Sequence, residues 1–232
     1  MKKIAIITAR GGSKRIHKKN IKPFFGKPII AYSIEAALQS GVFDEVMVST
    51  DDEEIASIAC EYGANVPFMR SEATSNDTSN TVDVLEEVLL QYRTNGFEFD
   101  VACCLYPTAP FVTADRIKEA LALLEIKKAD TVLPITAFSF PILKSFKMDD
   151  QSRVSFNWNE YQGFHSQQLP SSYHDSGQFY CFQVAGFLQH KKLFTGNTVG
   201  LEIPETEVQD INTEDDWRMA EIKFGYLHPE LR

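Results

Sequence analysis

Short apolar runs alternate with longer amphipathic segments along most of this 232-residue chain. Runs of strand length occupy residues 4–7, 45–49, 101–106 and 131–135, with a shorter one near 64–68. Between them lie segments with helical spacing, at 28–39, at 51–63, at 81–94 and from Thr113 onward. Strands that alternate with helices favour right-handed βαβ units. We therefore predict a Rossmann-like α/β fold, with a mostly parallel sheet and helices on both faces.

The alternation changes between residues 138 and 176. The sequence KSFKMDDQSRVSFNW (144–158) alternates polar and apolar residues around the turn-like stretch 149–152, which predicts an antiparallel hairpin. Further strands at 177–185 and 199–203 and a helix that begins within NTEDDW (212–217) complete the expected elements. We expect one domain over 1–232 with a hairpin subdomain inserted at 138–176. This insertion is a candidate dimer contact or a lid, and a plain surface excursion is equally compatible with the pattern.

Positive charge is concentrated near the start of the chain. Nine basic residues and no acidic residue precede Glu35, although the whole chain carries a formal charge of -9. An acidic protein is poorly suited to sequence-independent nucleic-acid binding, whereas a compact basic locus suits a small polyanion such as a triphosphate. The apolar run at 4–7 is too short for a signal-peptide core, and no run reaches the ~20 residues of a membrane span. We expect a cytoplasmic protein that binds neither membrane nor nucleic acid.

A glycine-containing loop, TARGGSKR (8–15), follows the first expected strand. It matches neither the G-x-G-x-x-G fingerprint of dinucleotide-binding dehydrogenases nor the G-x-x-x-x-G-K-[ST] P-loop. It offers the backbone N–H groups of Gly11 and Gly12, the Ser13 hydroxyl and several cations, which together suit a triphosphate. The alternative interpretation is a glycine-rich turn with a solvated basic face.

The stretch ARGGSKRIHKKN (9–20) resembles the A-R-x-x-S-K-x-x-P-x-K-N signature of the sugar-acid cytidylyltransferases, the acylneuraminate cytidylyltransferase family. Further matching segments follow in family order: 26–56, VPFMR (66–70), CLYPTAPF (104–111), LPSSYHDSGQFY (169–180) and VQDINTEDDW (208–217). They narrow the resemblance to members that use pseudaminic acid. The resemblance implies an enzyme that joins CTP to a nine-carbon acidic sugar, with release of pyrophosphate. It also implies Mg²⁺ as cofactor and a homodimer.

The resemblance also assigns roles to individual residues. Nucleotide binding falls to Ala9, Arg10, Gly11, Gly12, Ser13, Lys14, Lys19, Asn20, Arg70, Pro107, Thr108 and Ala109. The catalytic residues are Arg10, Lys14, Lys19 and Asp210. Sugar binding falls to Tyr106, Gln178, Phe179 and Tyr180, of which strand alternation lets at most one of the last two face the site.

Two positions depart from the family pattern in a way that bears on function. Tyr106 stands where sialic acid enzymes commonly have glutamine, which favours a different nine-carbon sugar. Sialic, legionaminic and 3-deoxy-manno-octulosonic acids remain alternatives. The family holds Mg²⁺ with two aspartates two residues apart, whereas this chain has Asp210 and Asn212. Asn212 could donate a neutral oxygen to the metal or cap the following helix. It also favours the alternative of a catalytically silent module that binds CTP or a CMP-sugar.

Overall fold

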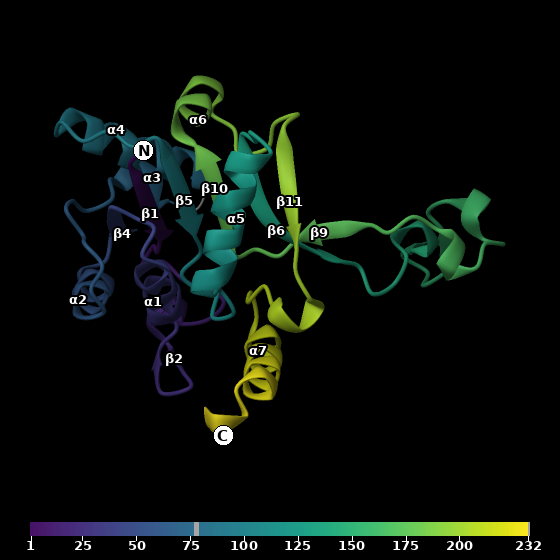
Figure 1. The fold of residues 1–232 in the computed structure, drawn as a ribbon. Helices are drawn as coiled ribbons and strands as arrows, with labels where there is room; N and C mark the ends of the chain where they lie inside the picture. The colour runs from purple at the N-terminus through teal and green to yellow at the C-terminus, as the bar shows by residue number, and fades with distance from the viewer. Residues whose placement is uncertain (77–78, 232) are drawn as a thin grey trace.

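A seven-stranded sheet forms the centre of the computed structural model, which describes residues 1–76 and 79–231 (Figure 1). Its strands are β1 (Lys3–Thr8), β4 (Glu45–Ser49), β5 (Val101–Leu105), β6 (Thr131–Ala137), β9 (Tyr173–Asp175), β10 (Phe179–Gln183) and β11 (Thr198–Glu202). The order is β11-β6-β10-β5-β1-β4, with β9 paired to β6. β1 runs parallel to β4 and β5, and β11 runs parallel to β6. The expected mostly parallel sheet is confirmed, with β9 and β10 as its antiparallel members.

Helices cover both faces of this sheet, as the alternation predicts. Successive β1 residues point to opposite faces, so Ala5 and Ile7 join one core while Ile4 and Ile6 join the other. The first core includes residues of α1 (Ile30–Ser40), α2 (Glu53–Glu61) and α5 (Ala114–Ile126). The second includes residues of α4 (Thr81–Thr94) and α6 (Val184–His190). One further helix, α3 (Glu72–Ser75), and two short strands, β2 (Pro23–Phe24) and β3 (Lys27–Pro28), lie outside the main sheet.

Several expected boundaries were wrong, for local reasons. The helix expected from residue 28 begins at Ile30, because Pro28 pairs with Pro23 in the β2–β3 ribbon. The strand expected at 64–68 is a single bridge between Met47 and Asn65. The strand expected to run to residue 185 ends at Gln183, where α6 follows at once.

An arm formed by residues 138–172 projects from the edge of the sheet (Figure 1). It carries the inserted hairpin, in which β7 (Phe146–Met148) and β8 (Val154–Phe156) pair antiparallel as expected. Short 3₁₀ helices at Ile142–Lys144, Asn159–Tyr161 and Ser166–Gln168 make up much of the remainder. The chain returns to the main sheet through β9, which pairs with β6. The arm is therefore anchored at both ends but stands clear of the two main cores.

A third core fastens the last helix, α7 (Glu214–Leu227), to the segment that follows the basic loop. Phe24 lies at its centre, with ring centroids 5.5 Å from Trp217 and 5.2 Å from Phe224. Ile211, fully buried, belongs to the same cluster. This packing holds residues 210–212, which immediately precede α7, close to the loop after β1. Further 3₁₀ helices lie at Lys19–Ile21, Glu205–Glu207 and Pro229–Leu231.

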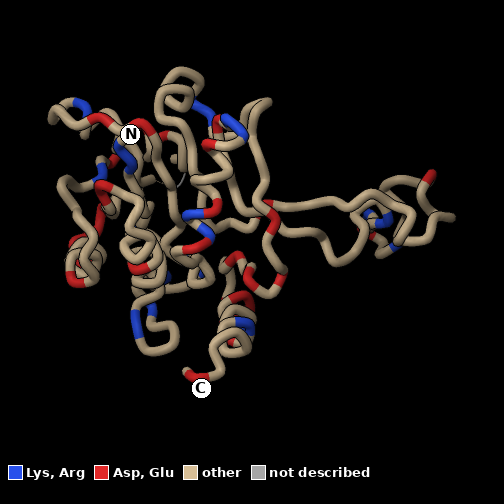
Figure 2. Tube along the Cα trace, viewed as in Figure 1, with Lys and Arg blue, Asp and Glu red and all other residues tan. Residues whose placement is uncertain are grey.

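Acidic and basic residues lie close together over the body of the molecule (Figure 2). None of the helices in residues 1–76 and 79–231 combines the length and apolar character required to span a membrane.

Replacing Phe224 with alanine should remove a large part of the third core. Phe224 is 3% exposed, and we expect its loss to lower the free energy of unfolding by about 3–5 kcal/mol. Tyr226→Ala is the matched control, because that aromatic residue lies on the same helix but is 68% exposed. Denaturant titration of both variants measures the difference. Equal losses in the two variants would contradict the role assigned to this cluster.

Candidate active site

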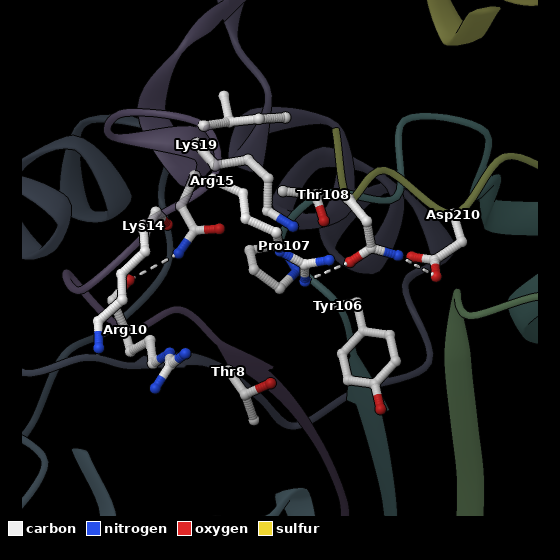
Figure 3. A pocket seen from close by; sticks show the side chains of 13 residues that line it. Thr8, Arg10, Lys14, Arg15, Lys19, Tyr106, Pro107, Thr108 and Asp210 are labelled. Atoms are coloured by element: carbon white, nitrogen blue, oxygen red, sulfur yellow. Dashed lines mark hydrogen bonds between the residues drawn. The ribbon is translucent and has the colours of Figure 1, made fainter. Parts of the chain in front are cut away.

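A cavity of about 420 Å³ opens at the carboxyl ends of β1 and β5, where ligands bind in open α/β sheets. Its volume lies within the ~300–1,000 Å³ typical of small-molecule sites. Its lining comes from the loop after β1, the segment after β5 and the segment before α7 (Figure 3). The lining residues are Thr8, Arg10, Ser13, Lys14, Arg15, Ile16, Lys19, Asn20, Tyr106, Pro107, Thr108, Asp210 and Asn212. Ten of these thirteen residues were predicted from the sequence to belong to the site.

Two side chains hold the basic loop in shape. Asn20 is buried, and its Nδ2 donates to the backbone carbonyl of Arg10 at 2.8 Å, which joins the two ends of the loop. Asp51 accepts a hydrogen bond from the Gly11 N–H at 2.9 Å. That N–H is therefore engaged by protein, and the expectation that it is free for an anion was wrong.

Lys19 points into the cavity from the short helix after the loop. Its Nζ donates to the backbone carbonyl of Ile211 at 2.7 Å, which ties the loop to the segment before α7. Burial lowers the pKa of Lys19, and the nearby Asp210 carboxylate opposes that shift. Desolvation thus disfavours the charged form of Lys19, and a bound anion would stabilise that form.

Seven of the nine basic residues of the N-terminal locus fall into two groups. Three of them pair with carboxylates from elsewhere in the chain, in the pairs Lys18–Glu54, Lys22–Glu214 and Lys27–Glu35. The other four, which include Lys19, line the cavity, and the described part of that lining contains one carboxylate, that of Asp210. The concentration of charge is thus partly structural, and only the second group is placed to bind an anion.

Asp210 and Asn212 lie together at the edge of the cavity. The Asn212 Nδ2 donates to Asp210 Oδ2, and the Asn212 Oδ1 accepts from Arg15 Nη2 at 2.8 Å. Thr213, and not Asn212, caps α7, because its side chain accepts from the Asp216 N–H in a capping box. The interpretation of Asn212 as the helix cap was therefore wrong.

The donor set available to a metal is small. Among residues 1–76 and 79–231, no group of three or more His, Cys, Asp or Glu side chains is placed to hold a metal ion. Asp210 is exposed at the cavity and offers one carboxylate, whereas the Asn212 oxygen already accepts from Arg15. One carboxylate fits Mg²⁺, which completes its shell with water and substrate phosphates.

Only some of the remaining residues assigned to the nucleotide line the cavity. Pro107 and Thr108 line the cavity, whereas Ala109 is buried in the first core. Arg70 is 8% exposed and lies outside that lining, with its Nε 3.0 Å from Ser49 Oγ and its Nη2 2.6 Å from Ser49 O. Burial lowers the pKa of Arg70.

Of the residues assigned to the sugar, Tyr106 alone is in this lining. Tyr180 lies against it, with ring centroids 5.8 Å apart, and the Tyr180 hydroxyl donates to Asp175. Both rings line a neighbouring cavity of about 460 Å³. Gln178 is buried and donates to the backbone carbonyl of Glu207, and Phe179 is fully buried in the first core. Alternation along β10 thus sends Tyr180, and not Phe179, to the cavity side.

Thr8, Arg15 and Ile16 line the cavity although sequence analysis did not assign them to it. Arg15 is the one of chemical interest. Its position within SKR, next to the assigned Lys14, was the available signal. The bond from Arg15 to Asn212, 197 residues later, could not be inferred from the sequence.

A mostly parallel sheet with a cationic cavity at the carboxyl ends of its strands is typical of nucleotide-binding α/β proteins. The fold resembles that of a CMP:2-keto-3-deoxy-manno-octonic acid synthetase solved with CTP, with a TM-score of 0.69 at 18% identity, over 97% of this chain and 99% of that one. The two chains therefore share an overall fold.

Sequence comparison then identifies the family. The Cytidylyltransferase family model matches residues 4–199. The chain is 37% identical over 228 residues to pseudaminic acid cytidylyltransferase of Campylobacter jejuni, covering 98% of each. It is 31% identical over 223 residues to the CMP-N,N'-diacetyllegionaminic acid synthase of Legionella pneumophila, covering 95% of each. This chain belongs to the cytidylyltransferase family, as the sequence resemblance predicted.

The two loop glycines differ in the space around them, which allows a matched test. A Cβ on Gly11 would lie 2.7 Å from Asp52 Oδ2, whereas a Cβ on Gly12 would meet no atom within 4 Å. Because Asp52 also caps α2, we expect Gly11→Ala to cost about 1–3 kcal/mol of stability. Gly12→Ala should change it by less than about 0.5 kcal/mol. Thermal unfolding of the pair provides the measurement, and a Gly12 variant as unstable as the Gly11 variant would contradict this geometry.

Proposed function

We propose that this enzyme transfers CMP from CTP to the anomeric hydroxyl of pseudaminic acid and releases pyrophosphate. The observation that carries the proposal is a cavity whose described lining has four basic side chains and one carboxylate, in a chain of the cytidylyltransferase family. The substrate follows from the relative that matches 98% of this chain and is named for pseudaminic acid. We also propose a cytoplasmic location, because CTP is an intracellular nucleotide.

In the proposed reaction the anomeric oxygen of the sugar attacks the α-phosphorus of CTP. A new O–P bond forms, the bond from the α-phosphorus to the α,β-bridging oxygen breaks, and pyrophosphate leaves with that electron pair. The proton of the anomeric hydroxyl is released to water. Phosphoryl transfer of this kind needs positioning and neutralisation of spreading negative charge. Arg10, Lys14 and Lys19 line the cavity and would supply that charge. Lys19 would do so from a fixed position, since its ammonium is already held by the Ile211 carbonyl.

Mg²⁺ is the proposed cofactor. The Asp210 carboxylate would hold it, with Asn212 beside that carboxylate, and phosphates and water would supply the other ligands. The ion would offset part of the triphosphate charge when bound. Asp210 itself orients toward the cavity without a metal, because Asn212 donates to it.

The sugar would approach from the side of Tyr106. Tyr106 lines both the cationic cavity and the neighbouring one that Tyr180 also lines. Burial raises the pKa of both tyrosines, so their hydroxyls stay protonated at neutral pH. The Tyr106 hydroxyl can donate to the sugar, whereas the single O–H of Tyr180 already donates to Asp175. Tyr180 in turn is held by Asp175.

Pyrophosphate release from CTP and Mg²⁺ should be fastest with pseudaminic acid, in a panel that includes N-acetylneuraminic, legionaminic and 3-deoxy-manno-octulosonic acids. Lys19→Ala should lower the rate at least about 100-fold, because a preorganised charge at the transferring phosphate is lost. Lys118→Ala is the control, since that exposed lysine of α5 lies outside the cavity. Faster release with another sugar would reassign the substrate. CTP binding with no release on any sugar would indicate the catalytically silent module instead.

We further propose a homodimer in which the arm contacts a second copy. The arm carries large apolar side chains that are strongly exposed, including Phe140 at 61%, Met148 at 69% and Val154 at 64%. Apolar side chains gathered on a projecting element favour burial against another chain.

Light scattering should therefore give a mass about twice the 26.2 kDa of the chain. Phe140→Asp combined with Met148→Asp should shift the protein to monomer, because a buried unpaired charge disfavours the interface. Ile126→Asp, at a 75% exposed site on the body, should not. A wild-type protein that is already monomeric would remove the dimer proposal.

A further inference from the structure

Arg15 occupies the cavity in an unusual chemical setting. It extends from the basic loop toward the segment before α7, where its Nη2 donates to Asn212 Oδ1 at 2.8 Å (Figure 3). Asn212 also contacts Asp210, because its Nδ2 donates a hydrogen bond to that carboxylate. A cation and a carboxylate are thus joined through one neutral amide.

The orientation of that amide follows from its neighbours. A guanidinium only donates hydrogen bonds, and an ionised carboxylate only accepts them. The amide oxygen must therefore face Arg15 and the amide nitrogen must face Asp210; the reverse orientation would oppose donor to donor and acceptor to acceptor. Asparagine satisfies both partners at once, whereas an aspartate could not donate to Asp210.

The neutral link leaves the charge of Arg15 in place. An aspartate at residue 212 would form an ion pair with the guanidinium and cancel most of its charge locally. Asn212 instead fixes the side chain without neutralising it. Arg15 is exposed at the cavity, so the N–H groups not directed at Asn212 remain accessible to a bound anion.

The charges around Arg15 favour a polyanion. Among the described residues, Arg10, Lys14, Arg15 and Lys19 line the cavity with one carboxylate, that of Asp210. The Asp216 carboxylate lies outside this lining but near enough to Arg15 and Lys19 to interact with both, so the four cations outnumber two carboxylates. Arg15 is near enough to Lys19 to lower the pKa of that lysine further, after the larger effect of burial. Like charges at this separation repel and disfavour the empty state. A triphosphate relieves that repulsion to a greater extent than the single carboxylate of a sugar acid.

We propose that Arg15 binds the triphosphate of CTP directly, and that Asn212 positions it for this contact. The inference rests on the proposed function, since it takes CTP as the nucleotide. In the family pattern a second aspartate helps to hold a metal ion, and that ion brings positive charge to the triphosphate. In this chain Arg15 would supply part of that positive charge. CTP should consequently bind with appreciable affinity even when no divalent cation is present.

The test is calorimetric titration of the full-length protein with CTP, once in EDTA and once with Mg²⁺. In EDTA, Arg15→Ala should weaken binding about tenfold or more, because a charge-assisted contact to phosphate is lost. Arg15→Lys should recover part of the affinity, since it keeps the charge but loses the planar fork. Arg93→Ala is the control, since it removes one positive charge at a 63% exposed side chain that lies outside the cavity.

Asn212→Asp tests the positioning role. We expect it to weaken CTP binding in EDTA about as much as Arg15→Ala does, because the new carboxylate neutralises the guanidinium. With Mg²⁺ it should regain affinity, since two carboxylates then hold the ion, so its ratio of Mg²⁺ to EDTA affinity should exceed that of the wild type. A purely structural role for Asn212 would leave that ratio unchanged.

Each outcome bears on one claim. Wild-type affinity of the Arg15→Ala variant in EDTA, at a melting temperature equal to that of the wild type, would overturn the inference while leaving the proposed function intact. An Arg15→Ala variant that binds CTP normally but has a raised KM for the sugar would also overturn it and assign Arg15 to the sugar carboxylate. Failure of the wild type itself to bind CTP with or without Mg²⁺ would instead overturn the proposed function.

Discussion

Repulsion among the basic side chains of the cavity is the constraint on which the arrangement of this site depends. Arg10, Lys14, Arg15 and Lys19 would separate in a flexible loop, and hydrogen bonds to the loop and to Lys19 help to keep them together. The buried amide of Asn20 joins its two ends, and the Ile211 carbonyl holds Lys19. The aromatic core around Phe24 supplies the rigid support behind these contacts. The free energy of hydrophobic packing thus offsets an electrostatic cost at the site.

Much of the fold could be predicted from local patterns because those patterns reflect local physics. Asp52 and Thr113 were expected at helix starts and are N-caps in the structure, and Gly41 ends α1 with a positive φ of 63°. The misplaced boundaries arose where tertiary pairing prevailed. Pro28 suits the first turn of a helix, yet it is drawn into a ribbon with Pro23. The antiparallel direction of β10 depends on the long excursion through the arm, which periodicity does not encode.

The candidate site was predictable in its components but not in its connections. The family resemblance assigned Lys19, Pro107 and Asp210 to one site, and the three residues line one cavity, because the ends of parallel strands meet at one edge of the sheet. It could not show that the Gly11 N–H is taken by Asp51, or that Phe179 faces the core. Nor could it show that Arg15 reaches Asn212, since such a bond depends on how α7 docks and not on any local preference.

The docking of α7 has a consequence for how the pocket comes into being. Asp210 and Asn212 are 195 to 204 residues away from the loop 8–15 in the chain, yet Lys19, just after that loop, is placed by the Ile211 carbonyl. A growing chain on the ribosome contains β1, β4 and β5, which are neighbours in the sheet, well before it reaches this segment. Partly synthesised chains therefore display the cations without the groups that restrain them. The complete cavity therefore requires the segment before α7 to be docked by the aromatic core.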